Sequence, residues 1–328
     1  MNSVKLLENF EPFKDLWYDK CYYHALFPVI SHFNKDISSF LSNNIFAYSL
    51  KQQKDVLILE LKNLSRKTSD DLLQDIGISL KKSISDQIVA DVISSINHNN
   101  PVILGIDCFY ESIRFDTYKK NHWPHDLLIY GYDLTNKNFA IIEHDFRDSF
   151  EFKKKTITFK DIESSYYGYL QNISNNHATY YEYSLNPQSP QISPNDYKQI
   201  YVENLRKYKD EIYLNIDKIL MFKKELYTTT GSTNLASYFP LLLSSMNNIV
   251  NMKKIQKYSL LHIFDLPDTI IKNLNETISV WSTIRGIIGK YVFMSKFNIT
   301  SIEKAAAKLD SIYKAEQSFL LFLYDYIG

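Results

Sequence analysis

Residues 122–133 read HWPHDLLIYGYD, a run typical of a buried strand that begins with two histidines. A second β-rich run follows at 139–145, and the intervening DLTNKN favours a turn, so the two runs predict a β-hairpin. With the turn centred near Thr135, facing residues have numbers that sum to about 270, and His125 is expected opposite Asp145. Side chains placed in this way lie about 5 Å apart at Cβ, close enough for a carboxylate to bond an imidazole.

The rest of the first half mixes helices and strands. Residues 21–33 predict a short helix with Asp19 as its cap, which Pro28 kinks or ends early. A later helix is expected to be capped by Asp161. A further helix is predicted at 86–96, and strands are predicted at 55–61, 102–106, 156–159 and 178–185. This order indicates an α+β domain over residues 1–185.

A change of periodicity marks a second domain. Residues 186–196, NPQSPQISPND, hold three prolines among polar residues and predict a linker. Beyond them, apolar residues recur every three or four positions, as in an amphipathic helix. Thr300 and Glu303 form a capping box before another such stripe. Residues 197–328 are therefore expected to form an all-helical domain.

Composition excludes some classes of function. The chain has 37 Lys and Arg residues against 37 Asp and Glu residues, so no net field attracts nucleic acid or an anionic membrane. The N-terminus lacks the apolar core of a signal peptide and no later run could span a bilayer, so we expect a soluble cytoplasmic protein. No phosphate loop, dinucleotide fingerprint or metal-ligand cluster is present in the sequence, and neither a metal nor a cofactor is expected.

The two cysteines are too few for a disulfide framework, so each is judged as a thiol. Cys21 lies where the first helix should begin, and there unpaired amides and the helix dipole favour a thiolate. His125 is placed to accept the thiol proton, and Asp145 to hold the imidazole in one tautomer. Cys108 leaves a predicted strand without a helix dipole and is expected to be a packing residue.

Each of these residues also has an ordinary structural interpretation. Cys21 can be a half-buried structural cysteine, His125 a strand-edge histidine and Asp145 a turn residue that bonds local backbone. Other candidates fit the expected geometry less well. They are His24, His122 and His144 as bases and Asp148 as the orienting carboxylate.

The order of these motifs resembles a family of papain-like proteins, the N-terminal domains of butirosin biosynthesis protein H and its relatives, which are akin to bacteriocin-processing cysteine peptidases. The similar motifs are Cys-x-x-x-Ala-Leu at Cys21–Leu26, Asp107-x-x-Tyr110, Tyr118, His-x-x-x-x-Tyr-Gly-Tyr-Asp at His125–Asp133, and a strand that ends in Asp145. The resemblance covers about residues 15–185. It implies a papain-like catalytic domain, an N-terminal helix on a mostly antiparallel sheet, followed by the helical domain.

The resemblance also implies a cysteine acyltransferase. Cys21 would take an acyl group from the phosphopantetheine thioester of a carrier protein and pass it to an amine, which forms an amide in natural-product biosynthesis without ATP. His125 would be the base, and Asp145 would orient it. A peptidase or amidase that uses the same triad with water, and a binding protein on this fold with an unused thiol, are the alternative hypotheses.

Papain-like enzymes usually carry a glutamine or asparagine shortly before the cysteine to stabilise the oxyanion, and residues 15–20 contain neither. The backbone amide of Cys21 is expected to be one donor, with Tyr18 or the Trp17 indole as the other. Aromatic residues in the expected cleft suit a flat or apolar acyl chain, and core packing is the alternative explanation. These candidate substrate-binding residues are Tyr110, Tyr118 and Trp123.

Overall fold

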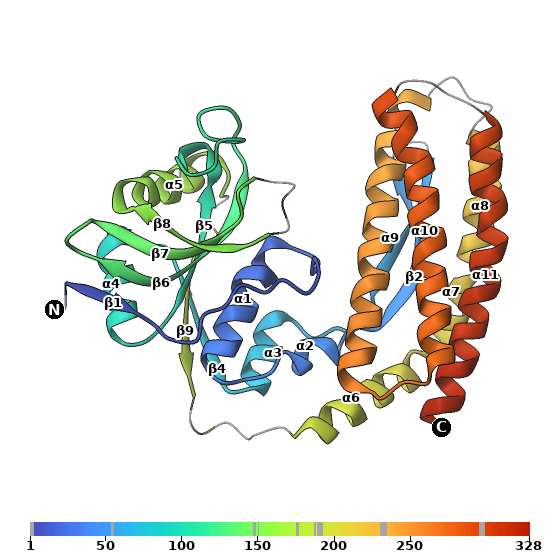
Figure 1. Cartoon of the computed structure of the whole chain (residues 1–328), viewed down its shortest axis with the longest axis horizontal. Helices are drawn as coiled ribbons and strands as arrows, with labels where there is room; N and C mark the ends of the chain where they lie inside the picture. Colours follow the sequence, from blue (N-terminus) through green and yellow to red (C-terminus); the bar gives the residue numbers. More distant parts are fainter. Residues whose placement is uncertain are drawn as a thin grey trace. The chain divides into compact units, whose positions relative to one another are not determined.

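The computed structural model divides the chain into two units, each discontinuous in sequence. Unit 1 contains Met1–Ser39 and Lys67–Ile192, and unit 2 contains Phe40–Arg66 and Ser193–Gly328. The residues that the structure describes are 3–53, 56–146, 149, 151–174, 177–186, 188, 193–229, 235–294 and 299–328. The fold is α+β, with an antiparallel sheet in unit 1 and a helical region toward the C-terminus (Figure 1).

The division differs from the expected domains in one respect. Residues 40–66 were assigned to the first domain, but they group with the C-terminal helices in unit 2. The expected linker at 186–196 coincides with the later boundary. Residues 187 and 189–192 of that linker lie outside the described residues, and helix α6 begins at Pro194.

Unit 1 is built on an antiparallel sheet with the strand order β4-β9-β5-β6-β7-β8, and β1 also pairs with β6. The strands are β1 (Val4–Leu6), β4 (Ile78–Ser83), β5 (Val102–Asp107), β6 (Pro124–Asp133), β7 (Asn138–Glu143), β8 (Lys153–Thr158) and β9 (Tyr180–Leu185). β5 is buried along its whole length because it lies between β9 and β6. The strands predicted after residue 100 are therefore confirmed.

The predicted hairpin forms from β6 and β7. Leu128 pairs with Ile142, which is the expected register, and this is the last pair at that end of the ladder. β7 ends one residue later, at Glu143. His125 continues in β6 and pairs with β5, whereas Asp145 lies beyond the end of β7. The two strands thus separate before they reach the predicted His125–Asp145 pair.

Helix α1 (Cys21–His32) packs against β6 and has Cys21 as its first residue. The predicted cap, Asp19, is wrong, because Lys20 is the N-cap residue and makes no side-chain cap bond. Pro28 lies inside α1 without ending it, and the residues on both sides of Pro28 are almost completely buried. The other helices of unit 1 are α3 (Ser69–Asp75), α4 (Ile88–Asn97), α5 (Phe159–Asn172) and the short η1 (Cys108–Tyr110).

Helix α5 shows a second difference in capping. Its cap is Thr158, whose hydroxyl accepts a hydrogen bond from the backbone N–H of Asp161 at 3.0 Å. Asp161, the residue predicted to cap, therefore lies in the first turn. α4 corresponds to the helix predicted at 86–96.

Unit 2 combines a β-hairpin with helices. The hairpin consists of β2 (Phe46–Gln53) and β3 (Val56–Asn63), and β3 matches the strand predicted at 55–61. The helices are α6 (Pro194–Lys207), α7 (Lys209–Ile216), α8 (Lys218–Thr229), α9 (Leu235–Ile263), α10 (Asp268–Met294) and α11 (Ile299–Ile327), and the short α2 (Ser38–Leu41) spans the first boundary in sequence. Figure 1 shows α9, α10 and α11 running side by side.

The helices of unit 2 differ from the prediction in two details. The amphipathic stripe after residue 197 is divided among α6, α7 and α8, which break at Tyr208 and Asp217. Thr300 lies inside α11, which begins at Ile299, so it is not the cap that the sequence indicated. In the described parts of the chain, no helix is long and apolar enough to cross a membrane.

A buried ion pair connects the hairpin of unit 2 to its helices. Lys253 of α9 lies 2.7 Å from Glu316 of α11, and both side chains are 3% exposed. The Tyr48 hydroxyl of β2 donates to Glu316 at 2.5 Å and accepts from the indole N–H of Trp281 at 3.1 Å. Charges buried in this way favour one packing arrangement, because either charge without its partner is strongly destabilising.

Glu316→Ala is therefore expected to lower the free energy of unfolding by about 3–5 kcal/mol, since Lys253 stays buried without its partner. Asp310→Ala removes the more exposed Lys223–Asp310 pair and should lower it by less than about 1 kcal/mol. Urea unfolding monitored by circular dichroism measures both values. Similar losses in the two variants would contradict the importance of the buried pair.

Candidate active site

The structure brings the Cys21 thiol to the His125 imidazole. Cys21 is partly exposed at the start of α1, whereas His125 on β6 is 3% exposed. The thiol lies within hydrogen-bonding reach of the ring and contributes to raising its pKa. Neither ring nitrogen makes a well-aligned hydrogen bond in this geometry, and catalytic hydrogen bonds are often misaligned until substrate binds. Two of the three predicted triad residues therefore lie together.

Glu143 is the carboxylate that meets His125. Its Oε2 lies 2.9 Å from His125 Nε2, and the Glu143 side chain is completely buried. Burial by itself lowers the pKa of His125, but the charge of Glu143 and the contact with Cys21 outweigh burial and hold that pKa well above its ordinary value. Burial likewise raises the pKa of Glu143, and the positive charges of His125 and Arg114 outweigh it and lower that pKa. The pair is therefore imidazolium and carboxylate near neutral pH.

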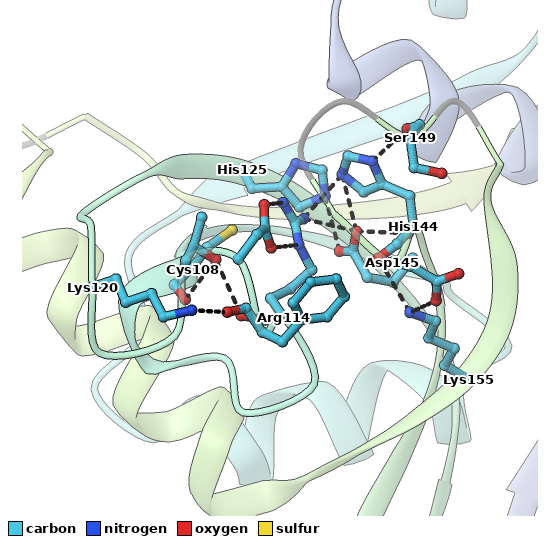
Figure 2. A network of polar contacts seen from close by, with 12 residues as sticks. Cys108, Arg114, Lys120, His125, His144, Asp145, Ser149 and Lys155 are labelled. Carbon is cyan, nitrogen blue, oxygen red and sulfur yellow. Dashed lines mark hydrogen bonds and ion pairs between the residues drawn. The ribbon is translucent and has the colours of Figure 1, made fainter.

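The structure does not bring Asp145 to His125. The Asp145 carboxylate is 39% exposed and pairs with Lys153 at 2.9 Å and with Lys155 at 2.7 Å. Figure 2 shows it turned toward Lys155. Glu143 lies on the same face of the hairpin, diagonal to His125, and its longer side chain spans the offset. The signal for Glu143 in the sequence is an acidic residue at the end of an otherwise apolar strand, NFAIIE.

Arg114 holds Glu143 and His144 in place, and Figure 2 shows Arg114 close to His144. The buried guanidinium lies 3.2 Å from Glu143 Oε1, donates to His144 Nε2 at 2.9 Å and donates to Asp116 at 3.2 Å. The other nitrogen of His144, Nδ1, donates to the carbonyl of Ser149 at 2.7 Å. Burial lowers the pKa of His144 to about 4, so this ring is neutral at pH 7. His144 therefore positions the network and does not act as its base.

The same cluster has the composition of a metal site. One ligand atom from each of His125, Glu143 and His144 lies within 4.8 Å of the others. The Arg114 guanidinium, however, already contacts Glu143 and His144, so the protein supplies its own cation at this position. A metal ion would have to displace that buried charge. The donor set therefore favours an ion-pair network over a metal centre.

A second buried carboxyl group, Glu111, adjoins this network. Its side chain is completely buried, and neither of its oxygens makes an aligned hydrogen bond within the described chain. Burial and the charge of Glu143 raise the pKa of Glu111 to about 8, so the group is neutral at pH 7. Cys108 contacts Glu111 and is also fully buried, and burial and Glu111 raise the pKa of its thiol. Cys108 is thus held as a thiol, and of the two cysteines Cys21 is the one that is partly exposed.

An aromatic stack supports the network from the side of α1. His24 stacks between Trp17 and Phe152, with ring centroids 4.7 Å and 4.6 Å away, and Phe152 also stacks on His144 at 4.7 Å. The backbone N–H of Tyr18 donates to His24 Nε2 at 3.1 Å. Burial lowers the pKa of His24 to about 4. His24 is therefore a neutral packing residue and not an alternative base.

The start of α1 also offers an oxyanion donor. Cys21 occupies the first helical position, where the backbone N–H has no partner within the helix. The Tyr18 side chain is 4% exposed and packs edge-on against two aromatic rings of α1. The Trp17 indole donates to the carbonyl of Asp19 at 3.2 Å. The Cys21 amide is the donor that the geometry supports, and a second donor from Tyr18 stays a prediction.

The aromatic residues expected to bind substrate come from the segment between β5 and β6. Tyr110 packs so closely on α5 that a Cβ added to Gly168 would lie 2.1 Å from its ring. Tyr118 and Trp123 are partly exposed. Tyr110 therefore packs against α5, and substrate contact by any of the three residues stays a prediction.

His122 is held more firmly than its position outside the hairpin ladder suggested. Its Nδ1 lies 2.6 Å from the buried carboxylate of Asp107, and its ring stacks on Phe109 at 4.4 Å. Asp107 also accepts the backbone N–H groups of Phe109 and Trp123, each at 3.1 Å. The Asp107–His122 pair therefore organises the loop that precedes β6.

No protein-family model matches the chain, and no curated protein matches it with significant similarity. The chemistry of the site must therefore be argued from its geometry. The site combines a partly exposed thiol at a helix N-terminus with a buried imidazolium–carboxylate pair.

Alkylation of Cys21 tests this arrangement without a substrate. Glu143→Gln is expected to slow the reaction of Cys21 with iodoacetamide at pH 6 by about tenfold, because an imidazolium without its counter-ion loses its proton more readily and stabilises less thiolate. Asp145→Asn is the matched change on an exposed carboxylate and should alter the rate by less than about twofold. Peptide mass spectrometry locates the adduct, and equal losses in both variants would exclude Glu143 as the orienting group.

Glu111 predicts a pH dependence of stability. Its pKa rises from 4.5 to about 8 on folding, so over this range the native state keeps a proton that the unfolded state releases. The resulting stabilisation is complete below the unfolded pKa and is lost as the pH rises through the folded one. In Glu111→Gln, the free energy of unfolding should therefore fall less between about pH 5 and pH 8 than in the wild type. Urea unfolding across this range measures the difference, and parallel curves would contradict a neutral Glu111.

Proposed function

We propose that the protein is a cysteine acyltransferase that takes an acyl group from a carrier-bound thioester and transfers it to an amine. The observation that carries the proposal is the meeting of the Cys21 thiol with His125 and of His125 with Glu143. A base beside the thiol and a carboxylate beside the base activate cysteine nucleophiles generally. The chain order of cysteine, histidine and carboxylate also resembles that of the butirosin H-like papain-like family, with Glu143 in place of an aspartate.

The first step forms an acyl-enzyme. The Cys21 thiolate, whose proton rests on His125, attacks the thioester carbonyl and forms a new C–S bond. The oxyanion lies toward the backbone amide of Cys21 at the start of α1. Cleavage of the donor's C–S bond releases a thiolate that takes the proton from His125. The products are acyl-Cys21 and the free thiol of the donor.

The second step forms the amide. A neutral amine attacks acyl-Cys21, and His125 accepts the amine proton as the C–N bond forms. The bond to Cys21 breaks, which restores the thiolate and imidazolium, while Glu143 stays ionised and stabilises the imidazolium in both steps. A thioester and acyl-cysteine are similar in energy, so formation of the amide drives the sequence forward.

The class of donor follows from the resemblance. A phosphopantetheine arm on a carrier protein would present the acyl group to Cys21, which is partly exposed. The amide would belong to a natural product, such as an antibiotic. The steps above require no further cofactor, since the thioester itself supplies the activated acyl group.

Acyl-enzyme formation is the direct test. An acyl N-acetylcysteamine thioester is expected to leave an adduct on Cys21, and Cys21→Ala should abolish it. His125→Ala should slow its formation more than Glu143→Gln does, because the first removes the base and the second only its partner. Intact-protein and peptide mass spectrometry follow the adduct. An adduct on Cys108 would contradict the proposed site.

Product analysis separates transfer from its alternatives. With an amine present, the transferase hypothesis predicts an amide as the main product. Free acid alone at every amine concentration would show a hydrolase that uses the same triad. Failure to form an adduct with any thioester would favour a binding protein whose thiol is unused.

A further inference from the structure

A second acidic residue lies next to the proposed base but faces elsewhere. Asp126 follows His125 in β6, and successive side chains of a strand point to opposite faces. In the sheet, Asp126 pairs with Gly105 of β5. The Tyr169 ring covers Gly105, because a Cβ added there would lie 3.4 Å from the ring. The side chain of Asp126 therefore shares one face of the sheet with the Tyr169 ring.

Two more tyrosines complete this surface. Tyr181 of β9 pairs with Ile103, which lies two residues from Gly105 and on the same face. The Tyr22 ring of α1 lies 6.3 Å from the Tyr181 ring in an edge-on contact, and Tyr22 directly follows Cys21. Tyr22, Tyr169 and Tyr181 are all partly exposed. We call Asp126 with these three tyrosines the Asp126 site, and Tyr22 connects it to Cys21 along α1.

The Asp126 carboxylate lacks a partner of its own. Within the described chain it forms no hydrogen bond or ion pair, although it is only partly exposed. Burial raises its pKa, and His125 and Lys20 oppose this only through their charges. The negative charge of Asp126 contributes to raising the pKa of all three tyrosines of the site. A partly desolvated carboxylate that forms no hydrogen bond or ion pair is unfavourable, and a bound cation would relieve that cost.

The geometry points to a substrate-recognition function for the Asp126 site: it binds a positively charged alkylammonium group of the substrate while Cys21 and His125 perform the acyl transfer. This inference rests on the proposed function. The carboxylate supplies the opposite charge, and the tyrosine rings supply faces that attract alkylammonium groups. The group belongs either to the acyl chain on the donor or to a second nitrogen of the acceptor amine. The acceptor's attacking nitrogen must itself be neutral, so Asp126 would hold a different one.

Two pairs of isosteric probes distinguish these sources. The donor pair consists of the N-acetylcysteamine thioester of an ω-trimethylammonio-hexanoyl chain and the analogue in which carbon replaces the nitrogen. Single-turnover formation of acyl-Cys21 gives a cationic-to-neutral rate ratio. The acceptor pair consists of (aminoethyl)trimethylammonium and the amine in which a tert-butyl group replaces the trimethylammonium group, and the decay of acyl-Cys21 to amide gives the corresponding ratio. Neither pair requires knowledge of the natural substrate.

Asp126→Asn is expected to lower the cationic-to-neutral ratio by about tenfold or more in one of the two half-reactions, because it removes a charge and preserves the shape. A fall in the donor ratio assigns the cation to the acyl group, and a fall in the acceptor ratio assigns it to the amine. Glu163→Gln is the control, since Glu163 is an exposed acid on α5, the helix that carries Tyr169. This control should leave both ratios as in the wild type.

The outcomes separate the two proposals. If acyl-Cys21 forms and both ratios are the same in Asp126→Asn as in the wild type, the Asp126 site is overturned and the acyltransferase stands. If neither thioester acylates Cys21 in the wild type, the proposed function fails, and the inference about Asp126 fails with it. Formation of acyl-Cys21 from the neutral thioester by Asp126→Asn shows that this variant is folded, so a changed ratio reflects recognition.

Discussion

The buried ion pair between His125 and Glu143 is the constraint on which the rest of the candidate site depends. Both side chains are at most 1% exposed, and a single charge left in that position would be strongly destabilising. Arg114 and the backbone N–H of His144 donate to the other oxygen of Glu143, and Glu111 stays neutral beside it. The network therefore fixes a protonated imidazole beside the partly exposed thiol at the start of α1.

The separation of β6 from β7 gives this pair its position. The ladder ends at Leu128, so His125 is free of β7 and lies between Glu143 on one side and the start of α1 on the other. The next residue, Asp126, faces the opposite side of the strand and the tyrosines there. Two consecutive residues of one strand thus have separate functions in the proposal, proton transfer for His125 and recognition of charge for Asp126.

Local patterns in the sequence predict much of this arrangement. The turn-forming residues between β6 and β7 predict the register of these two strands. The spacing of apolar residues after residue 20 places Cys21 at the start of a helix. Whether Asp145 or Glu143 bonds His125 depends on where β7 ends and on the length of the acidic side chain. Counting facing residues across the turn gives neither of these. Arg114 and Glu111 come from an irregular segment without periodicity, so nothing local marks them as partners of Glu143. Membership of β2 and β3 in unit 2 depends on packing against distant helices.

The protonation state of His125 tests the central claim most directly. Nitrogen NMR of the imidazole, in the wild type and in Glu143→Gln, reports whether both ring nitrogens carry protons at each pH. The account predicts that wild-type His125 stays an imidazolium well above its ordinary pKa of 6.5 and that Glu143→Gln titrates at lower pH. A wild-type ring that titrates near 6.5 and is unaffected by Glu143→Gln would contradict the account.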